Sequence, residues 1–316
     1  MKKIITLLFM MMILVIPLNV CAEEEDGPSI YERAYADVFT YGETVLPYRY
    51  VLPEDYTPEE QYPLVIFLHA KKESGVDNIS QLRHCVDYIR IKLPQSIIVA
   101  PQCSPGNQWV DTPLGENYSV SQIPESNELQ AVMALIEKIK VDFSIDADCV
   151  SAIGVSMGGY GVWDLLMRHT ESFASGVVMC GGGDPSQAER LKDMPIYIFH
   201  GIDDEVVSVS AAEEMIQSII DVGGTKARFY EIEDSTHDMC YELYFGKGVV
   251  ETMSRNKISD RQVVEQGEQE ESSDAQVVVD AGVKKKPPKI KFYVFVGMPF
   301  LLAIVGVVYV LKKVKF

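Results

Sequence analysis

The stretch Cys149-Val-Ser-Ala-Ile-Gly-Val-Ser156-Met-Gly-Gly159 joins an apolar run to a turn that is rich in glycine. The residues after it, through Leu166, fit an amphipathic helix. A serine at such a strand-to-helix turn is lifted above the sheet, because only small neighbours fit on either side. The helix N-terminus then presents backbone N–H groups, including that of Met157, to a developing oxyanion. Ser156 is therefore predicted to be a nucleophile, and the alternative is a glycine-rich turn that serves packing alone.

Around this stretch, apolar runs alternate with helical patterns. Runs typical of strands cover residues 48–52, 63–69, 96–100, 149–155, 176–180, 195–200 and 226–232. Apolar residues repeat at helical spacing from Leu129 to Ile139, and Ser210-Ala-Ala-Glu213 fits a capping box that opens another helix. This alternation predicts an α/β fold, with a mostly parallel sheet and helices on both faces. Residues 181–194 are too few for a large lid, so we expect little or no lid and an open cleft.

A serine alcohol needs a base, and the base needs an orienting carboxylate. His237 lies in a polar loop after the last predicted strand, where a base can reach over the sheet. Asp204 follows the preceding predicted strand and is the predicted acid, with Asp203 as the fallback and Asp184 as a third candidate. The order Ser156, Asp204, His237 is that of the α/β-hydrolases. The remaining histidines are predicted to be structural: His69, His84, His169 and His200.

A longer set of segments carries a resemblance to a known family. The segments lie between about residues 40 and 250 and are Leu46–Tyr56, Tyr62–His69, Val99–Cys103, Trp109, Gly154–Asp164, Cys180–Pro185, His200-Gly201 with Asp204, and His237-Asp238. In them the chain resembles the α/β-hydrolase carboxylesterases often grouped as predicted peptidases. These are related to polyhydroxybutyrate-depolymerase-like and feruloyl-type esterases and to the prolyl-oligopeptidase superfamily. The resemblance implies an α/β-hydrolase fold and ester hydrolysis through an acyl-serine, with no cofactor and no metal.

The loop after the first strand-end histidine departs from that family. Relatives usually have His-Gly-x-Gly-Glu-Arg-Gly there, and this chain has His69-Ala-Lys-Lys-Glu-Ser-Gly75. By the resemblance, this loop gives the second oxyanion N–H, which maps to Lys71. Ala70 and Lys72 replace residues that take positive φ freely, so we expect a displaced donor or a reshaped loop. Losing one such donor typically costs about 10²–10³ in rate.

The longest predicted loop beside the cleft runs from Gln102 to Ser126. Trp109 within it is predicted to bind substrate as part of the acyl or alcohol wall, and aromatic packing of the loop is the alternative. An open cleft on an acidic domain favours soluble or polymer-borne esters over bilayer lipid. The cysteines of the mature chain are odd in number, which predicts at least one free thiol and a role in packing. They are Cys85, Cys103, Cys149, Cys180 and Cys240.

Both ends of the chain carry membrane signals. Lys2 and Lys3 precede a short apolar run that ends in small residues up to Ala22, which is typical of a secretory signal peptide. Twenty residues without a charge, Phe292–Leu311, are enough to cross a bilayer as one helix. The predicted organisation is a signal peptide at 1–22, an α/β-hydrolase domain at 23–254, a low-complexity linker at 255–291, a transmembrane helix at 292–311 and a short basic tail at 312–316.

The charge of the chain limits its partners. The 316 residues include 28 Lys plus Arg and 46 Asp plus Glu, a formal net charge of −18, which disfavours a nucleic-acid-binding role. More lysines lie before the predicted span than after it, which alone would place the preceding side in the cytoplasm. The signal peptide argues the opposite, and we follow it.

Taken together, these features predict a secreted serine esterase that a single span anchors in the cell membrane, with its catalytic domain on the extracellular side. The expected partners are a small-molecule or polymer-borne ester and the membrane itself. The alternatives are a serine peptidase of prolyl-oligopeptidase type and a non-catalytic surface binding protein on a hydrolase fold.

Overall fold

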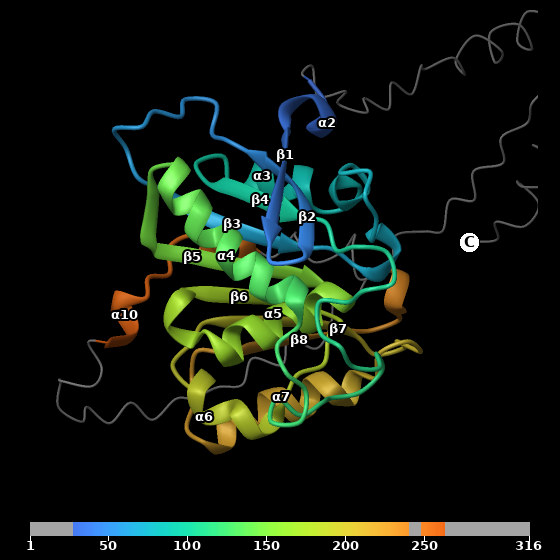
Figure 1. Cartoon of the computed structure of the whole chain (residues 1–316). Helices are drawn as coiled ribbons and strands as arrows, with labels where there is room; N and C mark the ends of the chain where they lie inside the picture. The colour runs from blue at the N-terminus through green and yellow to red at the C-terminus, as the bar shows by residue number, and fades with distance from the viewer. Residues whose placement is uncertain (1–27, 240–247, 263–316) are drawn as a thin grey trace, which may run out of the picture. The chain divides into compact units, whose positions relative to one another are not determined.

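The computed structural model describes residues 28–239 and 248–262, which are organised around one eight-stranded sheet (Figure 1). The strands are β1 Tyr35–Tyr41, β2 Thr44–Val51, β3 Tyr62–Leu68, β4 Ile97–Pro101, β5 Ile145–Val155, β6 Ser175–Met179, β7 Ile196–Gly201 and β8 Arg228–Ile232. Their order is β1-β2-β4-β3-β5-β6-β7-β8. The pairs β1–β2 and β2–β4 are antiparallel, and all other pairs are parallel. The mostly parallel sheet predicted from the alternating pattern is confirmed.

Helices cover both faces of this sheet, and the central strands are apolar for that reason. The α-helices are α2 Ile30–Arg33, α3 Val86–Lys92, α4 Asn127–Asp142, α5 Met157–Arg168, α6 Ala188–Leu191, α7 Val209–Asp221, α9 Val249–Met253 and α10 Ser259–Gln262. In β3, Leu64 and Ile66 belong to a hydrophobic cluster with α4, α5 and α7. Val65 and Phe67 belong to a second cluster with α3 and α9. Alternate residues of one strand thus enter two cores, as a strand covered on both faces requires.

Two elements differ from what the sequence pattern predicts. The edge strand β1 was not expected, because its residues are mostly exposed and show no apolar run. It is held instead by antiparallel backbone pairing with β2. Helix α7 begins at Val209 and its N-cap is Ser208, whose side chain accepts from the Ser210 N–H. The predicted capping box at Ser210 is therefore wrong by two residues, because the first serine of the pair already satisfies the free N–H of the helix start.

The connection between β6 and β7 is short. The β6–β7 connection holds only the 3-10 turn η4 Pro185–Gln187 and the helix α6 Ala188–Leu191.

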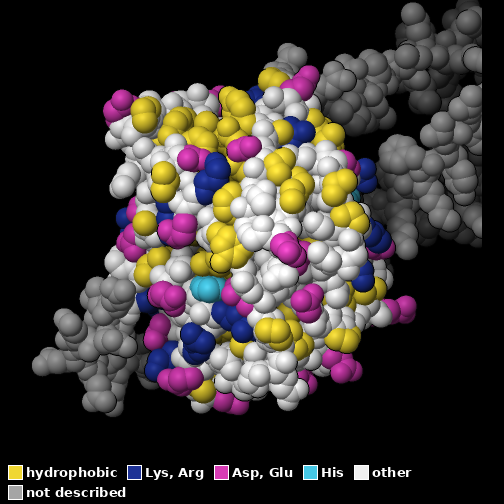
Figure 2. All heavy atoms as spheres, viewed as in Figure 1, with side chains coloured by type: hydrophobic (Ala, Val, Ile, Leu, Met, Phe, Trp, Pro, Cys, Tyr) yellow, Lys and Arg dark blue, Asp and Glu magenta, His cyan; other side chains and the backbone are white. Residues whose placement is uncertain are grey.

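On the face drawn in Figure 2, lysine and arginine side chains of the described residues lie in small groups among acidic ones.

The described chain continues past the predicted domain boundary at residue 254. Arg261 of α10 donates to the carbonyl oxygens of Thr170 and Phe173, so residues 255–262 pack on the domain. Within the described ranges, no helix is both long and apolar enough to span a bilayer. The predicted signal peptide, most of the linker, the transmembrane helix at 292–311 and the basic tail lie outside the described residues.

Candidate active site

Ser156 lies at the turn between β5 and α5, where the backbone is strained. Its φ of 54° and ψ of −116° are uncommon for a residue other than glycine. Its N–H donates to the Met179 carbonyl oxygen at 2.8 Å, which ties the turn to the end of β6. The residue is only 5% exposed. Since the turn follows the carboxyl end of a central strand, the hydroxyl lies at the edge of the sheet where α/β folds place their chemistry.

The glycines on both sides of Ser156 are required by close backbone contacts. A Cβ on Gly154 would lie 2.1 Å from the Gly158 carbonyl oxygen, and a Cβ on Gly158 would lie 1.9 Å from the Leu68 carbonyl oxygen. No side chain fits at either position without moving the backbone. The first turn of α5 therefore packs directly on the end of β3, where the loop with Lys71 begins.

His237 lies between the serine and a carboxylate. It opens the 3-10 turn η5 His237–Met239, which follows β8. Its Nε2 is 2.8 Å from Ser156 Oγ, and its Nδ1 is 2.8 Å from Asp204 Oδ2. The preceding loop is fixed to the end of β7 because the Asp203 N–H donates to the Ser235 carbonyl oxygen. The imidazole can thus accept a proton from the serine at Nε2 while Nδ1–H donates to the carboxylate.

Asp204 is a buried carboxylate with several donors. Its side chain has no exposed surface, and its Oδ1 accepts from the N–H groups of Val206 and Val207, each at 2.9 Å. Burial by itself would raise the pKa of this carboxyl group, but hydrogen bonds from His200, His237 and the two N–H groups outweigh it and hold the pKa well below its usual range. Asp204 therefore stays ionised and keeps His237 in the tautomer that the serine needs.

The structure does not bring the two alternative acids to His237. Asp203 is exposed, and its backbone N–H donates to this loop at the Ser235 carbonyl oxygen. Asp184 accepts from the N–H groups of Ser186 at 3.0 Å and Val120 at 2.8 Å, so it caps η4 and holds a loop. Of the three predicted carboxylates, only Asp204 contacts the histidine among the described residues.

The two predicted oxyanion donors lie at the starts of short helical segments. Met157 is the first residue of α5, and Lys71 is the first residue of the 3-10 turn η1 Lys71–Glu73. Neither N–H has a carbonyl partner within its own helix at such a position. Ala70 has a φ of −75°, so this loop forms its turn without the positive φ that glycine would supply. The loop is thus shaped as a regular 3-10 turn, with Glu73 N–H donating to the Ala70 carbonyl oxygen.

Trp109 does not line a cleft wall in the structure. It has no exposed surface and belongs to the main hydrophobic cluster. Its indole N–H donates to the His69 carbonyl oxygen at 3.0 Å, and its own carbonyl oxygen accepts from Ser126 Oγ at 2.6 Å. The prediction of a substrate-binding role is therefore corrected, and the alternative of aromatic packing describes this residue. Its indole supports the strand end from which the loop with Lys71 begins.

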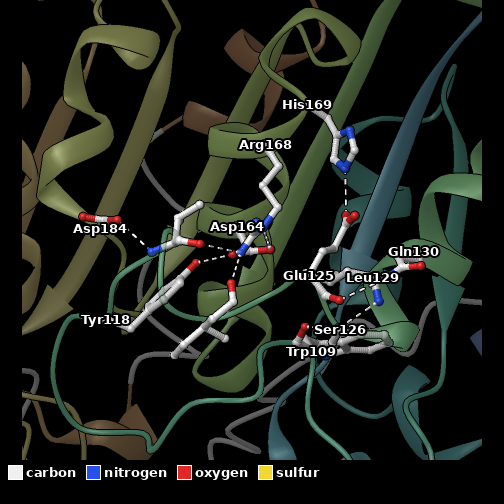
Figure 3. A network of polar contacts seen from close by, with 12 residues as sticks. Trp109, Tyr118, Glu125, Ser126, Leu129, Gln130, Asp164, Arg168, His169 and Asp184 are labelled. Atoms are coloured by element: carbon white, nitrogen blue, oxygen red, sulfur yellow. Dashed lines mark hydrogen bonds and ion pairs between the residues drawn. The ribbon is translucent and has the colours of Figure 1, made fainter.

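The rest of the loop from Gln102 to Ser126 is fastened to α5 by a polar network (Figure 3). Tyr118 Oη donates to Asp164 Oδ1 at 2.7 Å, and Arg168 Nε donates to the other oxygen of Asp164 at 2.7 Å. Asp164 is almost fully buried, so both partners offset the cost of burying its charge.

Cys180, which the sequence did not single out for the site, lies beside the triad. It is disulfide-bonded and follows β6 with a positive φ of 50°. Its Sγ, a carboxylate oxygen of Asp204 and a ring nitrogen of His237 lie within 4.8 Å of one another. Because the sulfur is in a disulfide and the other two groups bond to each other, this cluster is not a metal site. The other described cysteines are buried and free: Cys85, Cys103 and Cys149.

The fold and this hydrogen-bonded series of serine, histidine and aspartate define an α/β-hydrolase. Residues 44–287 match the model of the Esterase family, so the chain belongs to that family. The predicted resemblance is thereby confirmed.

Individual relatives support the same class. A thermostable esterase of known structure is 32% identical with a TM-score of 0.64, and the match covers 71% of this chain and 63% of that chain. Acyl-protein thioesterase 1 homolog 2 of Dictyostelium discoideum is 25% identical over 187 residues, 55% of this chain and 84% of that protein. Dipeptidyl-peptidase 5 of Porphyromonas gingivalis is 23% identical over 136 residues, 42% of this chain and 18% of that protein. The chain thus spans less than two thirds of the esterase and of the peptidase.

Proposed function

We propose that this protein is a serine carboxylesterase that cleaves esters through an acyl-serine intermediate. One observation carries the proposal. An unbroken hydrogen-bonded series runs from Ser156 Oγ through His237 to Asp204 at the carboxyl edge of the sheet. Each of the three groups follows a different strand, so the fold itself positions them, and the serine is on a strained turn that keeps its hydroxyl at the edge.

The geometry supports a two-step acyl transfer. His237 Nε2 takes the hydroxyl proton as Ser156 Oγ attacks the carbonyl carbon, and Asp204 stabilises the imidazolium that forms. The N–H groups of Met157 and Lys71 stabilise the developing oxyanion. The alcohol then leaves with the proton from His237. Water repeats the sequence on the acyl-serine: His237 takes its proton, the carboxylic acid leaves and Ser156 regains its hydrogen.

The relatives favour acyl transfer to water from oxygen or sulfur, since two of the three named above are an esterase and an acyl-protein thioesterase. We further propose soluble or polymer-borne esters as substrates. A serine peptidase is the second candidate, because the same series of groups would serve it and one relative is a dipeptidyl peptidase.

Hydrolysis of p-nitrophenyl esters from acetate to dodecanoate tests the proposal. We expect turnover of short chains by the wild type, and a fall in kcat of roughly 10⁴–10⁶ in Ser156→Ala and His237→Ala. His169→Ala is the matched control, because this half-buried histidine bonds to Glu125 and not to the triad. Its kcat should stay within about twofold of the wild type.

Three outcomes would contradict the proposal. Equal labelling of wild type and Ser156→Ala by a fluorophosphonate would remove the nucleophile assignment. A folded wild type that neither hydrolyses esters nor reacts with the fluorophosphonate would favour a binding protein. Faster cleavage of dipeptidyl p-nitroanilides than of any ester would favour the peptidase.

We also propose that the domain is exported by residues 1–22 and held at the outer face of the cell membrane by residues 292–311. The support for this is the sequence of the two ends, a basic and apolar start and twenty uncharged residues followed by lysines.

A further inference from the structure

A second histidine contacts the carboxylate that orients His237. His200 is the second-last residue of β7, four residues before Asp204, and it has no exposed surface. Its Nε2 lies 2.9 Å from the Val207 carbonyl oxygen and 3.3 Å from Asp204 Oδ2. His237 Nδ1 contacts the same oxygen, Oδ2, at 2.8 Å. One carboxylate oxygen is therefore shared by two imidazole rings.

The contacts of His200 show which of its ring nitrogens carries the hydrogen. Nε2 faces a carbonyl oxygen and a carboxylate oxygen, both acceptors, so it carries the hydrogen and donates. Nδ1 is buried without a hydrogen-bond partner in the described structure, so nothing there favours a second proton. The ring is a neutral donor whose single N–H is divided between Val207 and Asp204.

We propose that His200 is a positioning residue for the catalytic series, acting on His237 through Asp204. This rests on the proposed roles of Ser156, His237 and Asp204. Its single N–H connects the two ends of the turn Asp204–Val207, since it reaches the side chain of the first residue and the carbonyl oxygen of the last. The backbone N–H groups of Val206 and Val207 fix Oδ1, and His200 contacts Oδ2 beside His237.

This arrangement has two separate consequences. The turn holds Oδ2 in line with His237 Nδ1, so loss of His200 loosens the geometry of the base. The second donor also takes part of the negative charge of Oδ2, so loss of His200 leaves more charge to stabilise protonated His237. The first effect lowers kcat, and the second moves the acid limb of the pH profile to higher pH.

Among the described residues, Tyr160 and Cys180 also lie near this carboxylate. Burial raises the pKa of Tyr160 on α5, and this outweighs the hydrogen bond from the Gly115 N–H, which lowers it; the charge of Asp204 raises it further. Tyr160 therefore keeps its proton at neutral pH. Cys180 at the end of β6 is in a disulfide and does not titrate. The shift of the acid limb therefore reports on His200, Asp204 and His237.

The test compares His200→Leu and His200→Gln with wild type in the full chain. In His200→Leu we expect kcat for p-nitrophenyl acetate to fall about tenfold or more with KM nearly unchanged. The acid limb of kcat/KM should move to higher pH by roughly 0.5–1 unit. The glutamine amide can reach the two acceptors. His200→Gln should therefore keep most of the wild-type kcat and an acid limb close to that of the wild type. His169→Leu, a histidine substitution away from the triad, should leave the acid limb where it is.

A spectroscopic measurement separates this proposal from the proposed function. The downfield proton of the His237–Asp204 hydrogen bond is followed by NMR against pH, which needs no substrate. An inactive wild type that fails to label with fluorophosphonate would reject the esterase, while the titration midpoint of this proton would still move between wild type and His200→Leu.

Three results would overturn the role of His200. One is an acid limb and NMR midpoint that are unchanged in a folded His200→Leu. Another is equal loss in the leucine and glutamine variants with no change in pH profile. If His200→Leu does not fold, nitrogen NMR of the wild type decides: a neutral ring with its proton on Nε2 supports the proposal, and a proton on Nδ1 contradicts it.

Discussion

At the scale of single residues, the buried histidines differ in what their two nitrogens contact. His69 directly follows β3, and its Nδ1 lies 2.7 Å from the Ala70 carbonyl oxygen. Its Nε2 accepts from the Cys103 N–H at 2.9 Å. The ring must therefore be neutral, because a proton on Nε2 would oppose the N–H that it accepts. Burial lowers the pKa of His69 to about 4, against an ordinary value of 6.5.

This residue predicts a pH dependence of stability. Below about pH 6.5 the unfolded chain takes up a proton at His69 that the folded chain does not, so the free energy of unfolding falls as pH drops from about 6.5 to about 4. The loss attributable to His69 is about 3 kcal/mol by the end of that window. The variant His69→Gln should not show this loss between pH 6.5 and pH 4, even if its free energy of unfolding at pH 7.5 differs from that of the wild type.

Urea unfolding at several pH values measures this. The difference in free energy of unfolding between wild type and His69→Gln should be larger at pH 7.5 than at pH 4.5. Parallel curves for the two proteins would show that His69 is not the group that titrates.

Cys180 gives a second prediction at this scale. Its disulfide lies beside Asp204 and His237, so we expect reduction to loosen the packing of the base. Incubation of the wild type with a phosphine reductant should lower ester turnover severalfold. Cys180→Ala should have this lower turnover from the start and should no longer respond to reductant. Unchanged wild-type activity after thiol titration has shown full reduction would contradict the prediction.

At the scale of elements, the loop from Gln102 to Ser126 depends on buried polar contacts with α5. Burial raises the pKa of Tyr118 well above its usual value, so the phenol keeps its proton and donates to Asp164. In Tyr118→Phe the buried carboxylate keeps Arg168 but loses one donor. The free energy of unfolding should fall by about 1–3 kcal/mol.

Chemical denaturation of Tyr118→Phe measures the loss. Tyr31→Phe is the control, since this ring is 45% exposed and its change should cost less than about 0.5 kcal/mol. Equal stability of the two variants would show that the Tyr118 contact contributes nothing net to the loop.

The elements of this fold differ in how well the sequence predicts them. β3 and the second half of β5, residues 149–155, are recognisable because they are covered on both faces and are largely apolar. β1 has no such pattern, because it is an exposed edge strand that only backbone pairing holds. The start of α7 was misplaced because Ser208 and Ser210 both fit an N-cap, and only the structure shows which side chain bonds to the helix.

The residues of the site also differ in how well the sequence predicts them. The chain order of Ser156, Asp204 and His237 follows from strand ends and polar loops, which the sequence displays. The position of Cys180 beside Asp204 depends on β6 and β7 being neighbours in the sheet, and the sequence does not state the order β5-β6-β7-β8. His200 precedes Asp204 by only four residues, and only the structure shows that its ring contacts this carboxylate. Trp109 was misassigned because an aromatic residue in a long loop looks the same whether it faces substrate or core.

At the scale of the whole molecule, the structure moves the start of the predicted linker. Ser259 Oγ and Arg261 both bond to the domain, at Asp148 and at two carbonyl oxygens before β6. These contacts link the end of the described chain to the start of β5 and to the residues after α5. The folded domain therefore extends at least to Gln262, past the predicted boundary at residue 254.

This extent of the folded domain gives a prediction about intact cells. If the domain is exported and anchored as proposed, protease added outside should release an active esterase whose C-terminus lies between residues 263 and 291. Cleavage before Gln262 is disfavoured, because it would have to remove Arg261 from its two carbonyl partners. A chain without residues 292–311 should appear active in the medium, with no protease. Release is measured by ester turnover in the medium and by mass spectrometry of the fragment, with a cytoplasmic enzyme as the control for lysis. A domain that stays inaccessible until the cells are broken would contradict the outward orientation. It would favour the placement that the lysines on either side of residues 292–311 indicate by charge alone.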